Sequence, residues 1–495
     1  MRGHRWLLPL DLLVGLFALS AAVLGVVPSY NPELSYTVQA GVLLGCAVYF
    51  VVAHGPTGWD SLWWIGRLLM LAGIGVAALV ALQYAYLAWG ESPSFVQRAG
   101  NLTTLLPDLS IPRWHPNAAA TFLEIMIPLG IGLALSSRRL LRLFWTLGTL
   151  LWLYALVLTF SRGAGVGLGV TFLVAVIVLA RRRPVRIGAA VLLVAGIGGV
   201  LLSAAGSDWA LSRWILYRNS LFVAGDYAFT GIGLGSTFPL VYSRYGLLIQ
   251  VMQLSYPHNL FLSVWMGQGL PGLAAFGGMI VTLYLMVRRV IRSAKPRRLF
   301  HAAWLGVTTA LIHGLFDSRY YVESWWLLPS LFGLIGLAAA GGRIAMTHAL
   351  KHDAAVPTPY FPLRPAASIS IALLVGALVF NRELRAAWYT NLGALAETRA
   401  ELGEGLTDTQ RAALNSEAQD YYQQALALNP DWPNANRRSG WLAAKLENFA
   451  QAVAPLETAY RSEPSNPATI KGLGLAYVWN GQTENAARMF LLLDD

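Results

Sequence analysis

Residues 116–186 read PNAAATFLEIMIPLGIGLALSSRRLLRLFWTLGTLLWLYALVLTFSRGAGVGLGVTFLVAVIVLARRRPVR. This stretch holds three apolar runs, 116–135, 141–160 and 164–180, each close to the roughly 20 residues that a helix needs to cross a bilayer. Arginines gather after the first and third runs, whereas the turn 161–163 between the other two has a single one. An arginine-rich loop after every second apolar run is typical of membrane-spanning helices, because positively charged loops stay on the cytoplasmic side.

The same pattern extends over residues 1–383, and it predicts an all-α polytopic membrane protein. Hydrophobic residues make up 56% of the 495 residues and charged residues 12%, about half of the roughly 25% found in soluble domains. The net charge of +11 gathers in short loops, so we expect no nucleic-acid partner. The single cysteine excludes an intrachain disulfide and a cysteine metal site. We predict about eleven spans, at residues 7–27, 35–53, 65–88, 116–135, 141–160, 164–180, 186–205, 258–287, 299–316, 325–342 and 366–381.

The distribution of arginines predicts the orientation. With the N-terminus in the cytoplasm, the loops between spans at 136–140, 181–186 and 288–298 carry most of the positive charge on the cytoplasmic side. An odd number of spans then exports the C-terminus. The outer segment 205–257 is rich in tryptophan, tyrosine and phenylalanine, and we expect short helices that lie in the membrane interface there.

Residues 384–495 differ in kind from the rest of the chain. Charges become frequent, and a 34-residue period relates Ala425 to Ala459 and Gly440 to Gly474. This spacing resembles tetratricopeptide repeats, and an unrelated array of helical hairpins is the alternative. Because such repeats bury their apolar faces against neighbours, we expect this short tail to dock on the membrane domain or to continue in a longer chain.

His258 and Asn259 open the eighth predicted span, with Gly269 and Gly272 farther along it. On a straight helix both glycines point within about 40° of the histidine, which predicts a small-residue stripe for a close-packed second helix. Histidine suits general-base chemistry because its ordinary pKa is near neutral. An interfacial histidine above packing glycines is the alternative.

Three arginines on the predicted outer side are candidates for binding an anion. Arg162 lies in the tight turn 161–163, where it can snorkel to the interface or hold a phosphate. Arg213 and Arg218 are five residues apart and so point about 140° apart on a helix. We therefore do not expect these two to face one site together.

Two acids lie near the same face. Glu124 shares a helix face with Asn117, about 10 Å deeper, and is either the partner of a buried donor or a site residue. Asp317, at the outer end of its span, either orients His258 or pairs with Arg319. A histidine with outward arginines suits transfer from a lipid-linked pyrophosphate, in which arginines hold the leaving group and a base takes the acceptor proton.

These residues resemble the O-antigen ligase and O-antigen polymerase family of bacterial membrane glycosyltransferases. The family signature H-[NSQ]-X9-G-X-X-G is matched from His258-Asn259 through Gly269 and Gly272. Weaker similarities occur in the same order as in the family, over roughly residues 110–340: the H-P-N entry at 115–117, the S-R-G turn at 161–163, the G-x-G-x-G stretch at 231–235 and the histidine-to-aspartate segment at 313–317.

The resemblance implies a metal-independent, inverting transferase with a GT-C-like fold, without a cofactor, in the bacterial cytoplasmic membrane. The donor would be a glycan on undecaprenyl pyrophosphate and the acceptor a sugar, lipid or protein hydroxyl. His258 would activate that hydroxyl. Arg162 and Arg213, with Arg218 in reserve, would bind pyrophosphate, and Asn117, Asn259 and Asp317 are further substrate-binding candidates. The eleven spans differ from the twelve of the ligases, which leaves ligase and polymerase both open.

Two other classes remain alternatives. A transporter or flippase would show paired inverted repeats among its spans. A scaffold would use the spans only as an anchor, with the tail recruiting a protein partner for glycan assembly.

Overall fold

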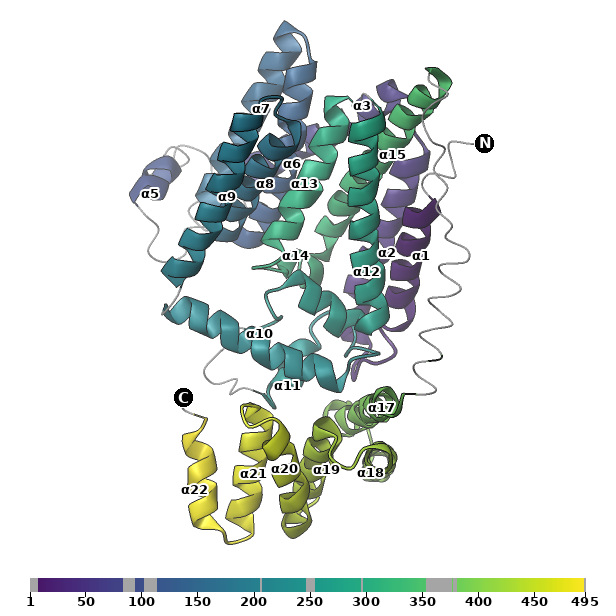
Figure 1. Cartoon of the computed structure of the whole chain (residues 1–495), viewed down its shortest axis with the longest axis vertical. Helices are drawn as coiled ribbons and strands as arrows, with labels where there is room; N and C mark the ends of the chain where they lie inside the picture. Colours follow the sequence, from purple (N-terminus) through teal and green to yellow (C-terminus); the bar gives the residue numbers. More distant parts are fainter. Residues whose placement is uncertain are drawn as a thin grey trace.

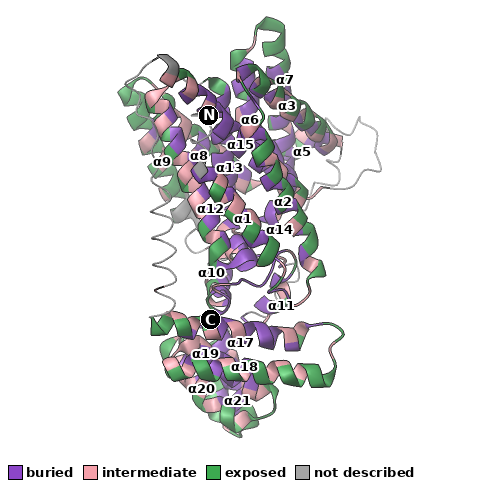
Figure 2. Ribbon diagram, turned by 90° about the vertical axis from the view of Figure 1, so that its right-hand side faces the viewer, coloured by how far each residue is buried: buried purple, intermediate pink, exposed green. Residues whose placement is uncertain are grey.

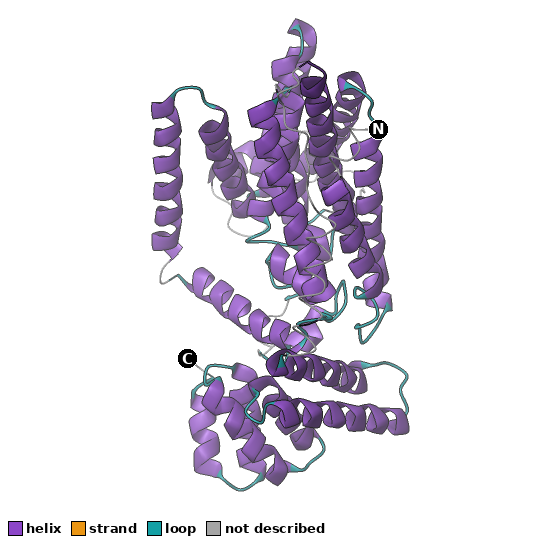
Figure 3. Ribbon diagram, turned by 45° about the vertical axis from the view of Figure 1, so that its right-hand side comes forward, coloured by secondary structure: helices purple, strands orange, loops and turns teal. Residues whose placement is uncertain are grey.

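The computed structural model describes residues 8–82, 94–101, 114–204, 207–245, 254–294, 297–352, 376 and 381–493. All regular elements within these ranges are helices and none is a strand (Figure 3). The predicted all-α class is thereby confirmed.

Seven helical stretches in the described ranges are long and apolar enough to cross a membrane. They are α2 (Glu33–His54), α3 (Trp59–Leu82), α6 (Pro116–Ser136), α7 (Arg139–Thr159), α8 (Arg162–Leu179), α12 (Leu260–Ser293) and the stretch Trp325–Leu350, which contains η3 (Trp325–Leu327) and most of α15 (Leu328–His352). The protein is therefore a multi-pass membrane protein.

Three more predicted spans coincide with helices outside that set. α1 (Leu8–Val23) and α13 (Arg298–His313) have 16 residues each, and α9 (Arg183–Ala204) has 22. The last predicted span, 366–381, lies outside the described residues except for residues 376 and 381.

α6 is the central helix of the bundle. Within the 18-residue apolar window of each helix, 89% of the residues of α6 are buried, against 17% in α8. α6 packs against α3, α7, α8 and α13 (Figure 1). It begins at Pro116 after His115, whose side chain accepts a hydrogen bond from the Asn117 amide, and a proline at the first helical position suits such a start.

The turn between α7 and α8 is short because both helix ends are closed locally. α7 ends at Phe160, which has a left-handed backbone (φ 47°), and Ser161 caps α8 by accepting from the Ala164 amide. Arg162 is therefore the first residue of α8.

Residues 207–245 lie across one end of the bundle (Figure 1). α10 (Asp208–Asp226) and α11 (Phe238–Tyr242) stand between the membrane helices and the C-terminal helices (Figure 1). Short helices were predicted in this part of the chain; α11 has five residues, whereas α10 has 19. The short helices α5 (Ser94–Asn101) and α14 (Arg319–Val322) complete the membrane part.

The tail consists of six helices that pack in consecutive pairs: α17 (Arg382–Leu402) with α18 (Asp408–Leu428), α19 (Pro433–Lys445) with α20 (Phe449–Ser462), and α21 (Pro467–Trp479) with α22 (Thr483–Leu491). α19 and α21 begin 34 residues apart, and so do α20 and α22. The buried faces of the pairs lie between the helices, while their outer faces are exposed (Figure 2).

The tail docks on the membrane part, one of the two outcomes that its short length predicts. Val223 and Ala224 of α10 share a buried apolar cluster with Ala394 and Leu395 of α17 and Ala468 of α21. The tail therefore lies on the same side of the bundle as α10.

Candidate functional site

His258 precedes α12 in a conformation that the surrounding chain holds in place. Its backbone is left-handed (φ 51°), which is uncommon for a residue other than glycine. The next amides are tied down, because Asn259 caps α12 by accepting from Phe261 and Leu262 at 3.0 and 3.1 Å, and the Leu260 amide donates to the Gly314 carbonyl. Backbone strain of this kind persists where neighbouring contacts over-determine it, which is common at functional sites.

Asp317 faces this histidine from another part of the chain. Its Oδ2 lies 3.8 Å from His258 Nδ1 and accepts a hydrogen bond from Asn117 Nδ2 at 2.8 Å. Its Oδ1 accepts from the Arg319 amide at 2.7 Å and from the Tyr256 hydroxyl at 3.4 Å. The buried Nδ1 of His258 has no hydrogen-bond partner in the described part of the chain. The carboxylate of Asp317 is thus held close to His258 Nδ1, just beyond hydrogen-bond distance.

The two groups favour complementary charge states. Burial lowers the pKa of His258, and the nearby charges of Arg213 and Arg319 lower it further, while Asp317 opposes them. Burial alone would raise the pKa of Asp317, but the His258 ring and the Arg319 amide hold it well below its usual range. A neutral imidazole beside an ionised carboxylate is the arrangement that a general base and its orienting group require.

Arg319 does not pair with Asp317 through its side chain, which was the alternative for that acid. Its guanidinium forms an ion pair with Glu323, donates to the Tyr256 hydroxyl at 3.0 Å and lies 5.4 Å from the centre of that ring. Asp317 is therefore turned towards His258 and Asn117.

The two arginines of α10 face different surroundings. Arg213 is close enough to His258 for its charge to act on that pKa, and it opposes the effect of burial on Tyr217. Arg218 instead acts on Tyr242 of α11, and its buried Nε has no hydrogen-bond partner among the described residues. This agrees with their expected divergence on one helix.

Arg162 lies at the exposed start of α8, with its guanidinium 5.6 Å from the Phe160 ring. Among the described residues, Arg162 has no hydrogen bond or ion pair with His258. Gly163 lies against His313, since a Cβ on this glycine would be 2.7 Å from the ring. His313 Nδ1 in turn pairs with Glu124 Oε1 at 2.7 Å, so the buried partner that Glu124 was expected to have is a histidine.

Tyr217 and His115 are site residues that sequence reasoning missed as such. The Tyr217 hydroxyl has one proton and lies within hydrogen-bond distance of two carbonyls, Leu315 at 2.9 Å and His258 at 3.2 Å, and so links α10 to the residues just before α12. Its spacing of four residues from Arg213 was the available signal. Burial, with the charge of Arg319, lowers the pKa of His115 to about 4.

The expected stripe of glycines on a straight helix is wrong. α12 begins after His258 and is kinked at Gly269, which has φ 63° and is followed by Pro271. A Cβ at Gly269 would overlap the Phe229 carbonyl, and one at Gly231 would overlap the Met266 carbonyl. Gly269 therefore admits the loop before α11, whereas a Cβ on Gly272 would meet only Gln268 of the same helix.

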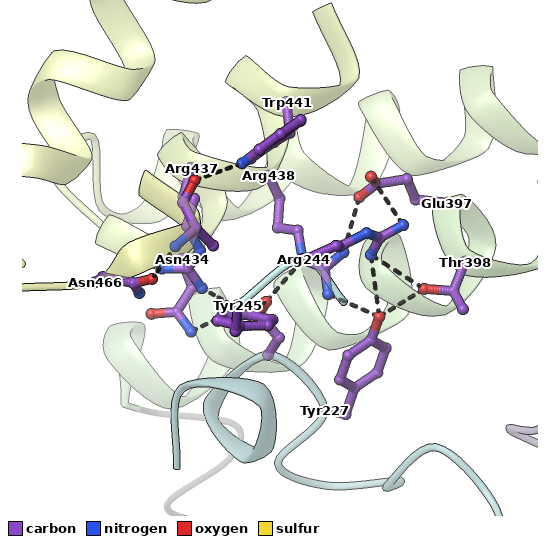
Figure 4. A network of polar contacts seen from close by, with 12 residues as sticks. Tyr227, Arg244, Tyr245, Glu397, Thr398, Asn434, Arg437, Arg438, Trp441 and Asn466 are labelled. Carbon is purple, nitrogen blue, oxygen red and sulfur yellow. Dashed lines mark hydrogen bonds and ion pairs between the residues drawn. The ribbon is translucent and has the colours of Figure 1, made fainter. Parts of the chain in front are cut away.

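A buried ionic network, which we call the docking network, joins α10 to the tail (Figure 4). Asp226, the last residue of α10, is fully buried and pairs with Arg437 and Arg438 of α19. Arg438 also pairs with Glu397 of α17 at 3.2 Å, and Arg244 pairs with the same carboxylate at 3.4 Å. The helix that carries Arg213 is thus anchored at its far end by the tail.

Within the described chain, no group of three or more histidine, cysteine, aspartate or glutamate residues could hold a metal ion. Residues 147–277 match a protein family described as O-antigen ligase. This stretch includes Arg162, Arg213, Arg218 and His258 together with both glycine motifs. No curated protein matches the chain.

Proposed function

We propose a specific transfer reaction for this protein. Its match over residues 147–277 places it in the O-antigen ligase and polymerase family. The protein moves a glycan from undecaprenyl pyrophosphate to an acceptor hydroxyl on the non-cytoplasmic side of the bacterial cytoplasmic membrane. Family membership by itself supports a more general function, the transfer of glycans by a membrane protein in O-antigen assembly.

The observation that carries the proposal is the pair formed by His258 and Asp317. Its lowered pKa keeps the His258 ring able to accept a proton at neutral pH, and the carboxylate stands 3.8 Å from Nδ1. In the reaction, the acceptor oxygen attacks the anomeric carbon of the donor sugar while His258 takes the hydroxyl proton. The bond from that carbon to the pyrophosphate oxygen breaks, and the configuration inverts. Asp317 orients the ring and stabilises the imidazolium that forms.

Undecaprenyl pyrophosphate leaves as an anion, and arginine is suited to hold it with two parallel hydrogen bonds. Arg213 is the better supported of the two α10 candidates, because its charge acts on His258. Arg162 supplies a second positive charge from the start of α8. No metal ion takes part in this scheme.

The orientation follows from the loop arginines, which put the N-terminus in the cytoplasm and His258 outside. Because the tail docks on α10, it lies on the same side as His258 and is exported with it. We assign residues 1–383 to the transferase domain and 384–495 to a tetratricopeptide-like domain whose outer surface recruits an acceptor or a protein partner.

The decisive experiment measures transfer by the purified full-length protein from undecaprenyl-pyrophosphoryl glycan, with sugar, lipid and protein acceptors supplied in turn. His258→Ala should reduce the rate by roughly 10²–10⁴-fold, the usual contribution of a general base. His301→Ala is the matched control and should leave the rate unchanged. It removes a half-buried histidine near the start of α13, at the end of that helix away from Asp317.

Undiminished transfer by the His258→Ala enzyme would remove the proposed general base. Absence of transfer by the wild type with every acceptor, together with movement of the lipid between leaflets, would favour the flippase alternative. If neither transfer nor movement occurs, the scaffold alternative is favoured.

A further inference from the structure

An arginine-lined cavity lies at the end of the bundle opposite His258. Its volume is about 720 Å³, and its lining includes Arg67, Arg138, Arg297 and Arg298 with Asp60 as the one acid. Ligand sites in proteins usually have about 300–1,000 Å³. α6 separates the two places, because Asn117 at its start contacts Asp317 while Ser136 at its end lines the cavity, about 28 Å away along the helix.

Arg67 is the half-buried charge that α3 contributes to this cavity. It lies eight residues, or about 12 Å, after the first residue of α3, a membrane-spanning helix. Its Nε is buried without a hydrogen-bond partner, and no carboxylate of the described chain lies within ion-pair distance of its guanidinium. The guanidinium is half-buried and has no carboxylate partner, so an anion that the protein itself does not supply would stabilise it.

Two helix N-termini add to the positive potential. α7 and α13 begin directly after Arg138 and Arg297, and neither start has a side chain that caps it. Their first amides are therefore available, and the positive ends of both helix dipoles favour an anion at the same place. Arg298 already donates to the Leu135 carbonyl near the end of α6. The three other guanidinium groups, Arg67, Arg138 and Arg297, and the two uncapped helix starts face one carboxylate, which favours an anion with more than one negative charge.

The surface beside the cavity is apolar and open to lipid. Leu140 of α7 is 84% exposed, and Trp64 and Leu68 of α3 are 63% and 62% exposed. The Trp64 ring stands 5.0 Å from the Arg67 guanidinium. Tryptophan beside arginine at a helix end is typical of the headgroup region of a membrane. A free phosphate would have no use for this apolar border, whereas acyl chains would cover it.

We propose that the cavity binds the headgroup of an anionic phospholipid with two phosphates, such as diphosphatidylglycerol. The arginines and the amides of α7 and α13 hold the phosphates, and the acyl chains lie along the exposed faces of α3 and α7. By the orientation proposed above this is the cytoplasmic leaflet. The site is separate from the transfer chemistry and does not depend on it.

The test is native mass spectrometry of the full-length protein after removal of lipid, titrated with diphosphatidylglycerol or phosphatidylethanolamine. We expect a one-to-one complex with the first lipid and a much weaker one with the second. The double variant Arg138→Gln, Arg297→Gln should lower the affinity about tenfold or more, since each lost contact is charge-assisted. Arg181→Gln, Arg182→Gln removes two exposed charges outside the cavity lining and should change it less than about twofold.

Equal weakening in the two double variants would overturn the proposal, because it would show only general attraction to a basic surface. Equal binding of the two lipids would also overturn it. Binding of inorganic pyrophosphate as tight as that of diphosphatidylglycerol would contradict a lipid ligand and identify a soluble anion instead. Thermal unfolding monitors the fold of each variant. If the cavity double variant does not fold, Arg67→Gln replaces it with the same expected loss.

Discussion

His258 combines a strained backbone, a half-buried ring and a neighbouring carboxylate. Each of the three has a separate cause in the structure: the hydrogen-bonded amides that follow residue 258, the packing of the ring against Tyr256, and the hydrogen bond from Asn117 to Asp317. The ring centroids of Tyr256 and His258 are 4.3 Å apart, so the tyrosine also limits how the imidazole can turn. At this scale the proposed chemistry depends on the protonation state of His258.

The nearby arginine allows that state to be tested. Arg213 lowers the pKa of His258 by its positive charge, so Arg213→Ala should raise this pKa and move the acid limb of the pH profile of kcat/KM to higher pH. In the wild type, the midpoint of the acid limb should lie at a pH below the ordinary histidine pKa of about 6.5. Measurement of transfer rates across the pH range gives both positions.

Arg218→Ala is the matched control for this experiment, since it removes the same charge from the same helix. Its charge acts on Tyr242, so the position of the limb should not move. Both substitutions can lower the rate itself. An equal shift in the two variants would contradict the assignment of Arg213 to the neighbourhood of His258.

Among the elements, α12 is the one that joins the two glycine motifs. The kink at Gly269 receives the loop before α11, where the Leu270 amide donates to the Ala228 carbonyl at 2.8 Å and the Ile232 amide donates to the Met266 carbonyl at 2.6 Å. The same loop continues from α10. The kink therefore sets the position of α10 relative to the residues that open α12.

Gly269→Ala should disrupt the contact between α12 and the loop before α11. At φ 63° and ψ −171° the backbone of Gly269 lies in a region that is almost restricted to glycine and costs another residue about 1–3 kcal/mol, and the added Cβ would also overlap the Phe229 carbonyl. We expect a lower unfolding temperature in detergent and a large loss of transfer activity. Gly277→Ala, in the same helix with no atom within 4 Å of the new Cβ, should be neutral or stabilise by up to about 1 kcal/mol. Similar behaviour of both variants would show that the kink is dispensable.

On the scale of the whole molecule, the tail and the membrane part are joined by the docking network. Burial opposes the charge of Asp226, yet Arg437 and Arg438 hold its pKa below the usual carboxyl range. The stabilisation from this ionised group is therefore present at neutral pH and is lost only as the pH falls through the lowered value. The tail is held where α10 ends, so its removal would expose the buried Asp226.

Asp226→Asn leaves two buried guanidinium groups without their shared partner, and breaking such a pair costs about 3–5 kcal/mol. We expect the tail to become sensitive to limited proteolysis and the unfolding temperature to fall. Transfer should weaken because α10, which carries Arg213, loses its anchor. Asp420→Asn, which neutralises an exposed acid on α18, should have no such effect. Equal protease resistance of the two variants would argue against a docked tail.

The sequence predicted the elements better than their contacts. Ten of the predicted spans coincide with helices because apolar length is a local property. The prediction of a glycine stripe was wrong because it assumed a straight helix, and the residues around Gly269 do not predict a positive φ at that position. Both possible roles of Asp317 remained open in the sequence, since only the folded chain brings Asn117 and His258 to its carboxylate.

By itself the sequence determined that this is an all-helical membrane protein, which end of its helices carries the arginines, and that His258 stands in a family motif. These properties follow from composition, length and spacing along the chain. Only the tertiary structure decided that Asn117, His258 and Asp317 meet, that Asp226 lies buried between Arg437 and Arg438, and that Arg67 opens into a cavity. The physical reason is that these contacts join residues far apart in the chain, so they depend on how the helices pack.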